Sequence, residues 1–174
     1  MLIEVPIPML LIINIVLWFL CHMFISLFAI KIPDEWFIKN KSLFKTMKWE
    51  KDGQVWDDIF YVRKWKDKLP DASQFMKKAY NKKSMLDTSL ESFEKFIIET
   101  RRAELTHWIS MLPAPLFFMR NPFWAGLIMI IYALVANSPF ILAQRYNRPR
   151  LERIYRLKYR QHHKISNPSI NLLN

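Results

Sequence analysis

Glycine and cysteine are almost absent from this sequence of 174 residues, which contains two glycines and one cysteine. Phosphate-binding loops and nucleophile elbows need several glycines at fixed spacing, because the backbone must approach a phosphate closely or turn sharply. The sequence therefore excludes both kinds of site. Cys21 alone cannot build a disulfide framework or a cysteine-based zinc site, and its place in an apolar run favours a small buried side chain.

Acidic residues are also scarce, since 15 Asp and Glu stand against 26 Lys and Arg in a chain that is 52% hydrophobic. This mixture is typical of apolar membrane spans that alternate with basic segments. The length suits one membrane domain over residues 1–174, without a separate soluble enzyme. Topology explains the basic charge beside apolar spans better than phosphate-backbone contacts do, so no nucleic-acid partner is expected.

Three apolar segments predict an all-α integral membrane protein with about three membrane segments. Residues 6–30 carry no charge and are long enough to cross a hydrocarbon core of about 30 Å. Residues 105–143 predict a helical hairpin, whose first arm is a marginal span and whose turn lies at Asn121-Pro122. Pro113 and Pro115 interrupt the backbone hydrogen bonds of the first arm, so it is expected to bend or to enter the bilayer partway.

The distribution of charge predicts the orientation in the membrane. Lys and Arg outnumber Asp and Glu over residues 31–102 and again over residues 144–174, whereas Glu4 is the one charge before the first span. Cytoplasmic segments collect Lys and Arg. We therefore expect a multi-pass protein of the cell membrane with its N-terminus outside and its C-terminus in the cytoplasm.

Residues 31–102 are predicted to form a cytoplasmic interfacial region of short helices. Lysines and aromatic residues mix here as they do in the headgroup layer, and simple anchoring is one explanation for them. The chain is expected to turn at Gly53, and residues 60–66 fit either a strand or a helix. After a helical stretch to about Lys78, a capping box at Thr88 predicts the start of a helix that runs into the membrane.

Two ionisable residues of this helix form a candidate catalytic pair. Glu104 and His107 are three residues apart and share one helix face at the bilayer boundary, where ionisable groups are costly. A carboxylate beside an imidazole can hold its tautomer and raise its basicity for deprotonating a hydroxyl. A structural alternative pairs Glu104 with Arg101, and His107 with a carbonyl freed by Pro113 or Pro115. No metal site is expected, because a di-iron bundle needs a second Glu-x-x-His motif.

Residues 144–174 are predicted to be a basic amphipathic tail in the cytoplasm. The last span is expected to close at residues 137–139, and Pro149 suits the first position of a new helix. Binding of anionic lipid headgroups explains most of the basic charge of the tail. Arg145 and Arg148 lie nearest to the span and are placed to hold a phosphate instead.

Three strings carry a resemblance to a known family: FYVRKWK at residues 60–66, IIETRRAELTHWIS at 97–110 and QRYNRPRL at 144–151. Over residues 32–156 the chain resembles the bacterial glycosyl-4,4'-diaponeurosporenoate acyltransferases of staphyloxanthin biosynthesis. The resemblance implies an enzyme that transfers a fatty acyl group to a sugar hydroxyl of a glycosylated C30 carotenoid acid. Two alternatives are acylation of another glycolipid and a non-catalytic membrane protein that binds lipid or scaffolds a pathway. A scaffold has no need of the candidate catalytic pair.

The predicted mechanism joins this resemblance to the ionisable pair. His107, oriented by Glu104, removes the hydroxyl proton, and the oxygen attacks a thioester of coenzyme A or an acyl carrier, with no bound cofactor. Arg145 and Arg148 hold the phosphate of the donor, and Asn147 is a polar positioning group. Further candidate substrate-binding residues are Arg101, Asn137, Lys64 and Trp65. The expected partners are the lipid bilayer, a glycosylated carotenoid or glycolipid acceptor, the acyl donor and other membrane enzymes of the pathway.

Overall fold

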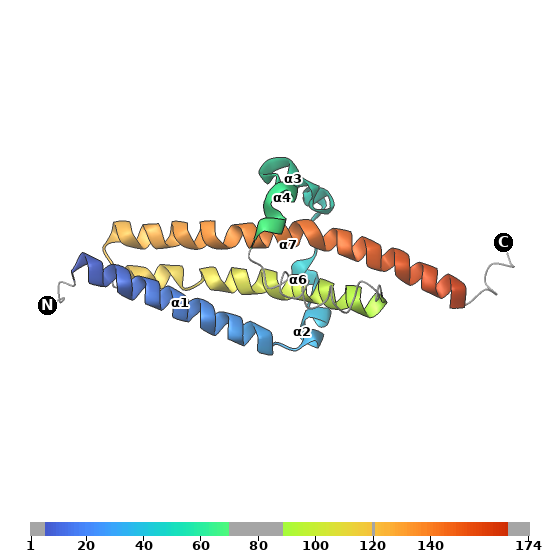
Figure 1. Cartoon of the computed structure of the whole chain (residues 1–174), viewed down its shortest axis with the longest axis horizontal. Coiled ribbons are helices and arrows are strands. Elements are labelled where there is room, and N and C mark those ends of the chain that lie inside the picture. The colour runs from blue at the N-terminus through green and yellow to red at the C-terminus, as the bar shows by residue number, and fades with distance from the viewer. Residues whose placement is uncertain (1–5, 70–88, 120, 167–174) are drawn as a thin grey trace. The chain divides into compact units, whose positions relative to one another are not determined.

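The computed structural model describes residues 6–69, 89–119 and 121–166. Within these ranges the chain forms helices joined by short turns and no strand, which confirms the predicted all-α class. The elements in chain order are α1 (Ile7–Lys31), α2 (Asp34–Lys39), η1 (Lys41–Phe44), η2 (Lys48–Gly53), α3 (Gln54–Phe60), α4 (Val62–Trp65), η3 (Lys66–Lys68), α6 (Leu90–Met111), η4 (Ala114–Met119) and α7 (Phe123–Ser166) (Figure 1).

The chain divides into two compact units. Unit 1 comprises residues 1–39 and 102–141, and unit 2 comprises residues 40–101 and 142–174, so α6 and α7 each contribute to both. The candidate catalytic pair lies in unit 1 together with Asn137. The other candidate residues belong to unit 2: Lys64, Trp65, Arg101, Arg145, Asn147 and Arg148.

The core of unit 1 lies around Trp18 of α1. Its indole stacks on Phe117 with ring centroids 4.9 Å apart, and Ala114 and Ala133 complete the buried cluster. The indole Nε1 donates to Met129 Sδ at 3.1 Å, which gives its polar end a partner. Small residues such as these alanines allow membrane helices to approach closely. The core thus joins α1 to η4 and to the first part of α7.

Two polar contacts fix α1 within unit 1. Asn14 and Asn121 exchange amide hydrogen bonds of 2.8 and 3.1 Å. At the other end of the helix, Arg102 of α6 donates to the carbonyls of Ala29 and Ile32. The last carbonyls of a helix have no intrahelical donor and carry partial negative charge, so a guanidinium satisfies both needs. The start of α6 within unit 1 is therefore tied to the end of the first apolar helix.

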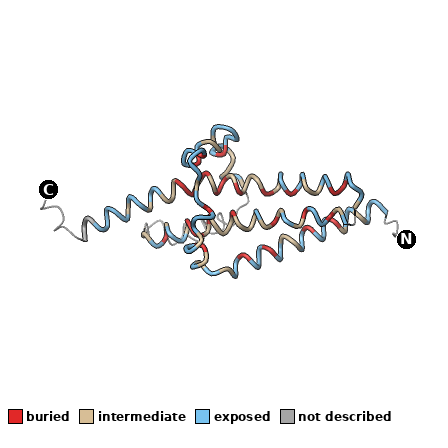
Figure 2. Tube along the Cα trace, turned by 180° about the vertical axis from the view of Figure 1, so that it is seen from behind, coloured by how far each residue is buried: buried red, intermediate tan, exposed pale blue. Residues whose placement is uncertain are grey.

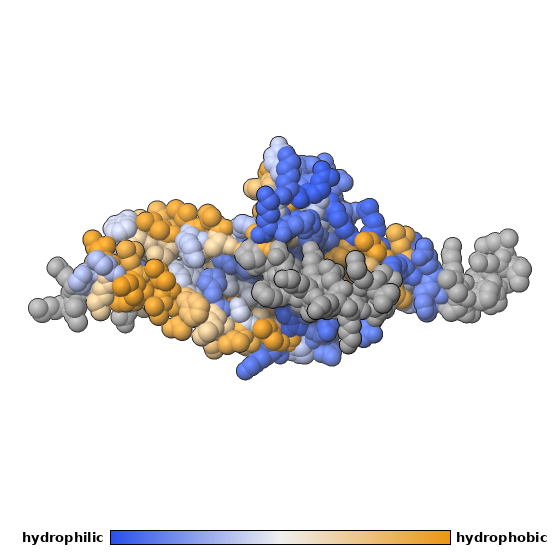
Figure 3. All heavy atoms as spheres, viewed as in Figure 1, coloured by the Kyte–Doolittle hydropathy of each residue, from blue (hydrophilic) through white to orange (hydrophobic). Residues whose placement is uncertain are grey.

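Two of the described helices, α1 and α7, are long and apolar enough to cross a membrane. Within their most apolar stretches, 17% of α1 and 28% of α7 is buried inside the protein. The core helix of a soluble protein would bury most of such a stretch, whereas exposed Leu, Ile and Phe side chains suit a lipid environment. Figure 2 shows the exposure of α1, and Figure 3 shows hydrophobic surface over α1 and the first part of α7. The two helices indicate a membrane protein.

The second predicted membrane segment, residues 105–119, is not one continuous helix. α6 ends at Met111, and the 3₁₀ turn η4 follows over Ala114–Met119. Pro113 and Pro115 lack the amide hydrogens that a longer α-helix needs, which explains this ending. Because the described residues hold two helices able to cross a membrane, a third membrane segment stays a prediction.

The predicted breaks in the last helix are wrong. α7 continues from Phe123 to Ser166 through Pro139 and Pro149, although the sequence predicted an end at the first proline and a new start at the second. A proline inside a helix leaves the carbonyl four residues earlier without its usual donor. For Pro149 this is the carbonyl of Arg145. The backbone of Gly53 packs against this carbonyl, since a Cβ added to the glycine would lie 2.8 Å from the oxygen. The helix therefore continues through Pro149 where Gly53 packs on the exposed carbonyl. Local sequence rules do not take such tertiary packing into account.

The predicted turn at Gly53 is confirmed, with a glycine φ of 84°. Lys51 and Asp52 also adopt left-handed backbone conformations, with φ of 47° and 55°. Each such non-glycine residue costs about 1–3 kcal/mol and persists where its surroundings hold it. The turn at residues 51–53 is therefore a strained segment that the rest of unit 2 maintains.

The remaining predictions for the middle of the chain have different outcomes. The ambiguous residues 60–66 form no strand: α3 ends at Phe60, Tyr61 has a left-handed φ of 52°, and α4 covers Val62–Trp65. The predicted stretch to Lys78 and the capping box at Thr88 lie outside the described residues. The helix expected after Thr88 is present as α6, which begins at Leu90.

Candidate active site

His107 is half-buried in unit 1, where it extends from α6 to Asn137 of α7. The imidazole Nδ1 lies 3.0 Å from Asn137 Oδ1, and Asn137 Nδ2 donates to the carbonyl of Ala133 at 2.9 Å. The second bond fixes which end of the amide faces the histidine, so the amide oxygen is the acceptor. Neutral His107 therefore carries its proton on Nδ1, and Nε2 holds the lone pair.

A second residue of α7 fixes the plane of the imidazole. The Phe140 ring stacks on His107 with centroids 4.4 Å apart and an interplanar angle of 11°. Asn137, one turn earlier, is 2% exposed, so its bond to the imidazole edge is shielded from water. An imidazole held at its edge and on its face has one orientation and one neutral tautomer. This is what a general base requires.

Glu104 lies one turn before His107 on the continuous helix α6, as the spacing predicted. Its carboxylate is 2% exposed, and Oε1 accepts a hydrogen bond of 3.4 Å from the Trp108 indole. The sequence assigned Glu104 the role of orienting the imidazole. The structure places Asn137 at the Nδ1 edge of the ring. Direct pairing of Glu104 with His107 stays a prediction.

Arg145 forms a bidentate ion pair with Glu50 in unit 2. Its Nε and a terminal nitrogen lie 2.6 and 3.0 Å from the two carboxylate oxygens. Glu50 is fully buried and also accepts from the Met47 backbone amide at 2.7 Å and from the Trp56 indole at 3.2 Å. A fork of two parallel bonds to a carboxylate is the strongest geometry that Arg offers. The phosphate role that the sequence predicted for Arg145 stays a prediction.

Arg148 is 1% exposed and links three segments of unit 2. Its guanidinium donates to the Phe44 carbonyl at 2.6 Å, to Thr100 Oγ1 at 3.1 Å and to the Thr100 carbonyl at 3.3 Å. Arg101, beside this contact, forms an ion pair of 3.2 Å with Glu152. Both arginines thus connect parts of unit 2 to one another. Their predicted contacts with substrate stay predictions.

The remaining candidate residues have local contacts. The Trp65 indole donates to the Phe60 carbonyl at 2.7 Å, and the Lys64 ammonium lies 4.7 Å from the centroid of the Tyr61 ring. Asn147 is half-buried on α7. These positions belong to the same unit as Arg145, but their predicted roles in substrate binding remain untested.

Sequence reasoning missed two features of these units. It placed Asn137 among the substrate-binding residues and did not find its bond to His107, which joins residues 30 positions apart. The available signal was a polar side chain within an apolar span, where unpaired polar groups are costly. Glu50 was missed altogether, because an acid among aromatic residues of an interfacial segment gives no sign of a basic partner 95 positions away.

Comparison with known proteins agrees with the strings noted in the sequence. The family described as glycosyl-4,4'-diaponeurosporenoate acyltransferase matches residues 40–157. The chain is 41% identical over 144 residues to the protein of that name from Staphylococcus aureus (strain bovine RF122 / ET3-1), covering 83% of this chain and 87% of the relative. Proteins of the same name from strains USA300 and MRSA252 are 41% and 40% identical over the same shares. No solved structure matches the chain.

These matches confirm the predicted resemblance, and with it the prediction that the chain is an acyltransferase. The family match includes His107 and Asn137 from unit 1, and Glu50 and Arg145 from unit 2. Because it extends over more than half of the chain, and the relatives align along most of both sequences, the chain belongs to the glycosyl-4,4'-diaponeurosporenoate acyltransferase family.

Proposed function

We propose that this acyltransferase moves a fatty acyl group from a thioester donor to a sugar hydroxyl of a glycosylated C30 carotenoid acid. The names of the relatives support the acceptor class. The observation that carries the chemistry is the 3.0 Å contact between His107 and Asn137, which defines the lone pair on Nε2. An ionisable side chain in or near a membrane-spanning segment is costly without a function, so a catalytic role accounts for its presence.

The proposed reaction needs one base and one acid, and His107 serves as both. Nε2 takes the proton of the sugar hydroxyl while the oxygen attacks the thioester carbonyl carbon. The new C–O bond gives a tetrahedral intermediate, from which the C–S bond breaks and the thiolate leaves. The imidazolium then returns the proton to the thiolate sulfur, so the free thiol and the acylated sugar are the products.

Asn137 and Glu104 are proposed as positioning residues for this base. The Asn137 amide oxygen keeps the proton on Nδ1, which leaves Nε2 ready to accept another. Glu104, buried one turn away, supplies negative charge where the imidazolium forms. The first effect sets the tautomer of the neutral ring and the second stabilises its charged form, so both are expected to change the rate of transfer more than the affinity for substrates.

The apolar helices suggest where the hydrocarbon parts of the substrates lie. The exposed apolar side chains of α1 and of the first part of α7 are suited to contact the polyene and the acyl chain. We place the N-terminus outside the cell and the C-terminus in the cytoplasm, because the segments rich in Lys and Arg then face the cytoplasm. A donor carried by coenzyme A or by an acyl carrier is available on that side.

Expression of the chain in cells that accumulate the glycosylated carotenoid tests the function. Chromatography and mass spectrometry of extracted pigment should show conversion to a less polar product heavier by one acyl group. Cells with empty vector should retain the unmodified acceptor. If the protein is present in the membrane fraction and the acceptor is unchanged, while another glycolipid is acylated, the proposed acceptor is wrong. If no lipid is acylated, the proposed reaction is wrong.

Replacing Asn137 by leucine should slow transfer by about 10- to 100-fold, the worth of a hydrogen bond of about 1.5–3 kcal/mol to a group that becomes charged. Leucine keeps the volume but lets the imidazole proton move between its two nitrogens. The loss should fall on kcat with little change in KM for the acceptor, which steady-state kinetics on purified protein would separate.

The matched control is Ser138→Ala, a small change at the neighbouring half-buried position of α7. It should leave kcat within about twofold of the wild type, a free-energy change below about 0.5 kcal/mol. Equal kcat values for Asn137→Leu and Ser138→Ala would show that the amide does not position the base.

A further inference from the structure

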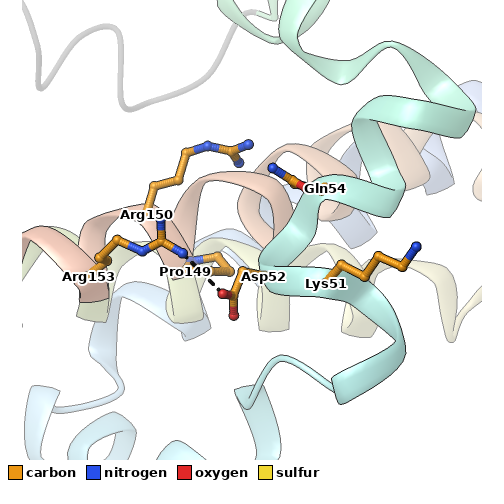
Figure 4. A pocket seen from close by; sticks show the side chains of 6 residues that line it. All are labelled: Lys51, Asp52, Gln54, Pro149, Arg150 and Arg153. Atoms are coloured by element: carbon orange, nitrogen blue, oxygen red, sulfur yellow. Dashed lines mark hydrogen bonds and ion pairs between the residues drawn. The ribbon is translucent and has the colours of Figure 1, made fainter.

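A small basic pocket in unit 2 lies between the strained turn and α7. Its space is about 150 Å³, and its lining residues are Lys51, Asp52, Gln54, Pro149, Arg150 and Arg153 (Figure 4). Three of the six side chains are cations and one is a carboxylate, so the pocket has an excess of positive charge. Its lining includes neither the candidate base nor Arg145 and Arg148.

The two arginines of the pocket are held differently. Arg150 lies over the Tyr146 ring, 3.6 Å from its centroid, and donates to the Tyr146 carbonyl. In Figure 4 its guanidinium lies near the Gln54 side chain, while Lys51 extends away from both. Arg153 forms an ion pair of 3.2 Å with Asp52, and both side chains are more than half exposed. Such an exposed pair contributes about 0–1 kcal/mol, so an anion with more charge can replace the carboxylate at Arg153.

The turn at residues 51–53, opposite the arginines, has a strained backbone. Lys51 and Asp52 adopt left-handed conformations, and Gly53 follows in the same region. The buried pair of Glu50 with Arg145 holds the residue before the turn, and Gly53 packs directly on the backbone of α7. This arrangement fixes Asp52 and Gln54 next to the arginines. Strain of this kind collects at ligand sites, where it prearranges the groups that bind.

We propose that this pocket binds a phosphate group through Arg150, Arg153 and the Gln54 amide. A water molecule takes about 30 Å³ of liquid, so the pocket has room for about five waters. That space suits one or two phosphoryl groups with some water. Guanidinium groups prefer phosphate because their paired donors match its oxygens. The phosphate comes either from a soluble acyl donor of the coenzyme A type or from an anionic phospholipid.

Assignment to the acyl donor rests on the proposed function, whereas phosphate binding by the pocket does not. Binding is therefore measured directly, by calorimetry on the full-length protein in nanodiscs of phosphatidylcholine. The soluble probes are coenzyme A and inorganic pyrophosphate. The lipid probe is short-chain dioctanoyl phosphatidylglycerol, with dioctanoyl phosphatidylcholine as its zwitterionic control. The variants are the double change Arg150→Gln with Arg153→Gln, the single change Asp52→Asn, and Arg156→Gln as an exposed control one turn further along α7.

The double variant should bind its probe about tenfold or more weakly than Arg156→Gln, because two charge-assisted bonds are lost. Asp52→Asn should bind it a few-fold more tightly, because the competing carboxylate is gone. Pocket-dependent binding of coenzyme A and pyrophosphate identifies a soluble donor, and pocket-dependent binding of phosphatidylglycerol alone identifies a lipid headgroup. Equal affinities of the double variant and Arg156→Gln for all probes would overturn the proposal, whether or not the enzyme transfers acyl groups.

Discussion

Replacing His107 by alanine is expected to lower acyl transfer by about 10²- to 10⁴-fold, the usual contribution of a positioned general base. The imidazole provides the lone pair on Nε2 that removes the hydroxyl proton, and alanine supplies no group that can take it. The protein should remain folded, because the ring is half-buried and its contacts with Asn137 and Phe140 lie outside the buried cluster around Trp18. The rate of formation of acylated carotenoid by purified protein measures the effect.

The control for this change is His162→Ala, which removes a histidine from the exposed end of α7. This variant should retain wild-type activity, and both proteins should show equal helix content by circular dichroism and equal amounts in the membrane. Retention of wild-type activity by His107→Ala under these conditions would remove His107 as the base. Loss of activity together with loss of helix content would instead indicate a structural role for the ring.

The charge of Glu104 offers a test of how the base is assisted. Glu104→Gln keeps the side-chain shape and its ability to accept from the Trp108 indole, but removes the negative charge near the imidazolium. Because Asn137 lies 3.0 Å from Nδ1, we propose an electrostatic role for this charge, so Glu104→Gln should lower kcat for acyl transfer in steady-state kinetics. The sequence assigned both the tautomer and the basicity of His107 to Glu104, whereas we give the tautomer to Asn137 and the charge effect to Glu104.

Sequence patterns correctly predicted the elements that depend only on neighbouring residues. The uncharged run before Lys31 gives α1, and the helical spacing of Glu104 and His107 holds because α6 continues through both. Gly53 marks a turn because its φ of 84° suits glycine. In each case the determinant is hydrophobicity, periodicity or backbone freedom over a few neighbouring residues.

Features with distant causes could not be predicted in this way. Pro149 predicts a helix boundary by local rules, yet α7 continues through it while Gly53 packs on the carbonyl that the proline exposes. The partner of His107 lies 30 positions away, and the partner of Arg145 lies 95 positions away. A polar residue in an apolar or aromatic segment indicates that a partner exists, but the tertiary fold decides which residue it is.

Replacing Arg145 by methionine is expected to destabilise the protein by about 3–5 kcal/mol, because it leaves the fully buried carboxylate of Glu50 without its cation. For a chain of this length, that loss corresponds to a fall in Tm of roughly 6–20 °C. Thermal unfolding of detergent-solubilised protein, followed by circular dichroism, measures it. The exposed Arg63, which pairs with the half-buried Asp57 at 3.7 Å, provides the control, and Arg63→Met should change Tm by about 4 °C or less.

A double change separates the charge from the shape of this pair. Glu50→Gln with Arg145→Met removes both charges and keeps an acceptor oxygen for one of the two donors, the Met47 amide or the Trp56 indole, so it should recover part of the lost stability. A wild-type Tm for Arg145→Met, accompanied by weaker binding of coenzyme A, would instead favour the sequence-based hypothesis that Arg145 holds the donor phosphate. A lower Tm with recovery in the double variant places Arg145 in the framework that fixes the strained turn, and leaves phosphate contact to Arg150 and Arg153.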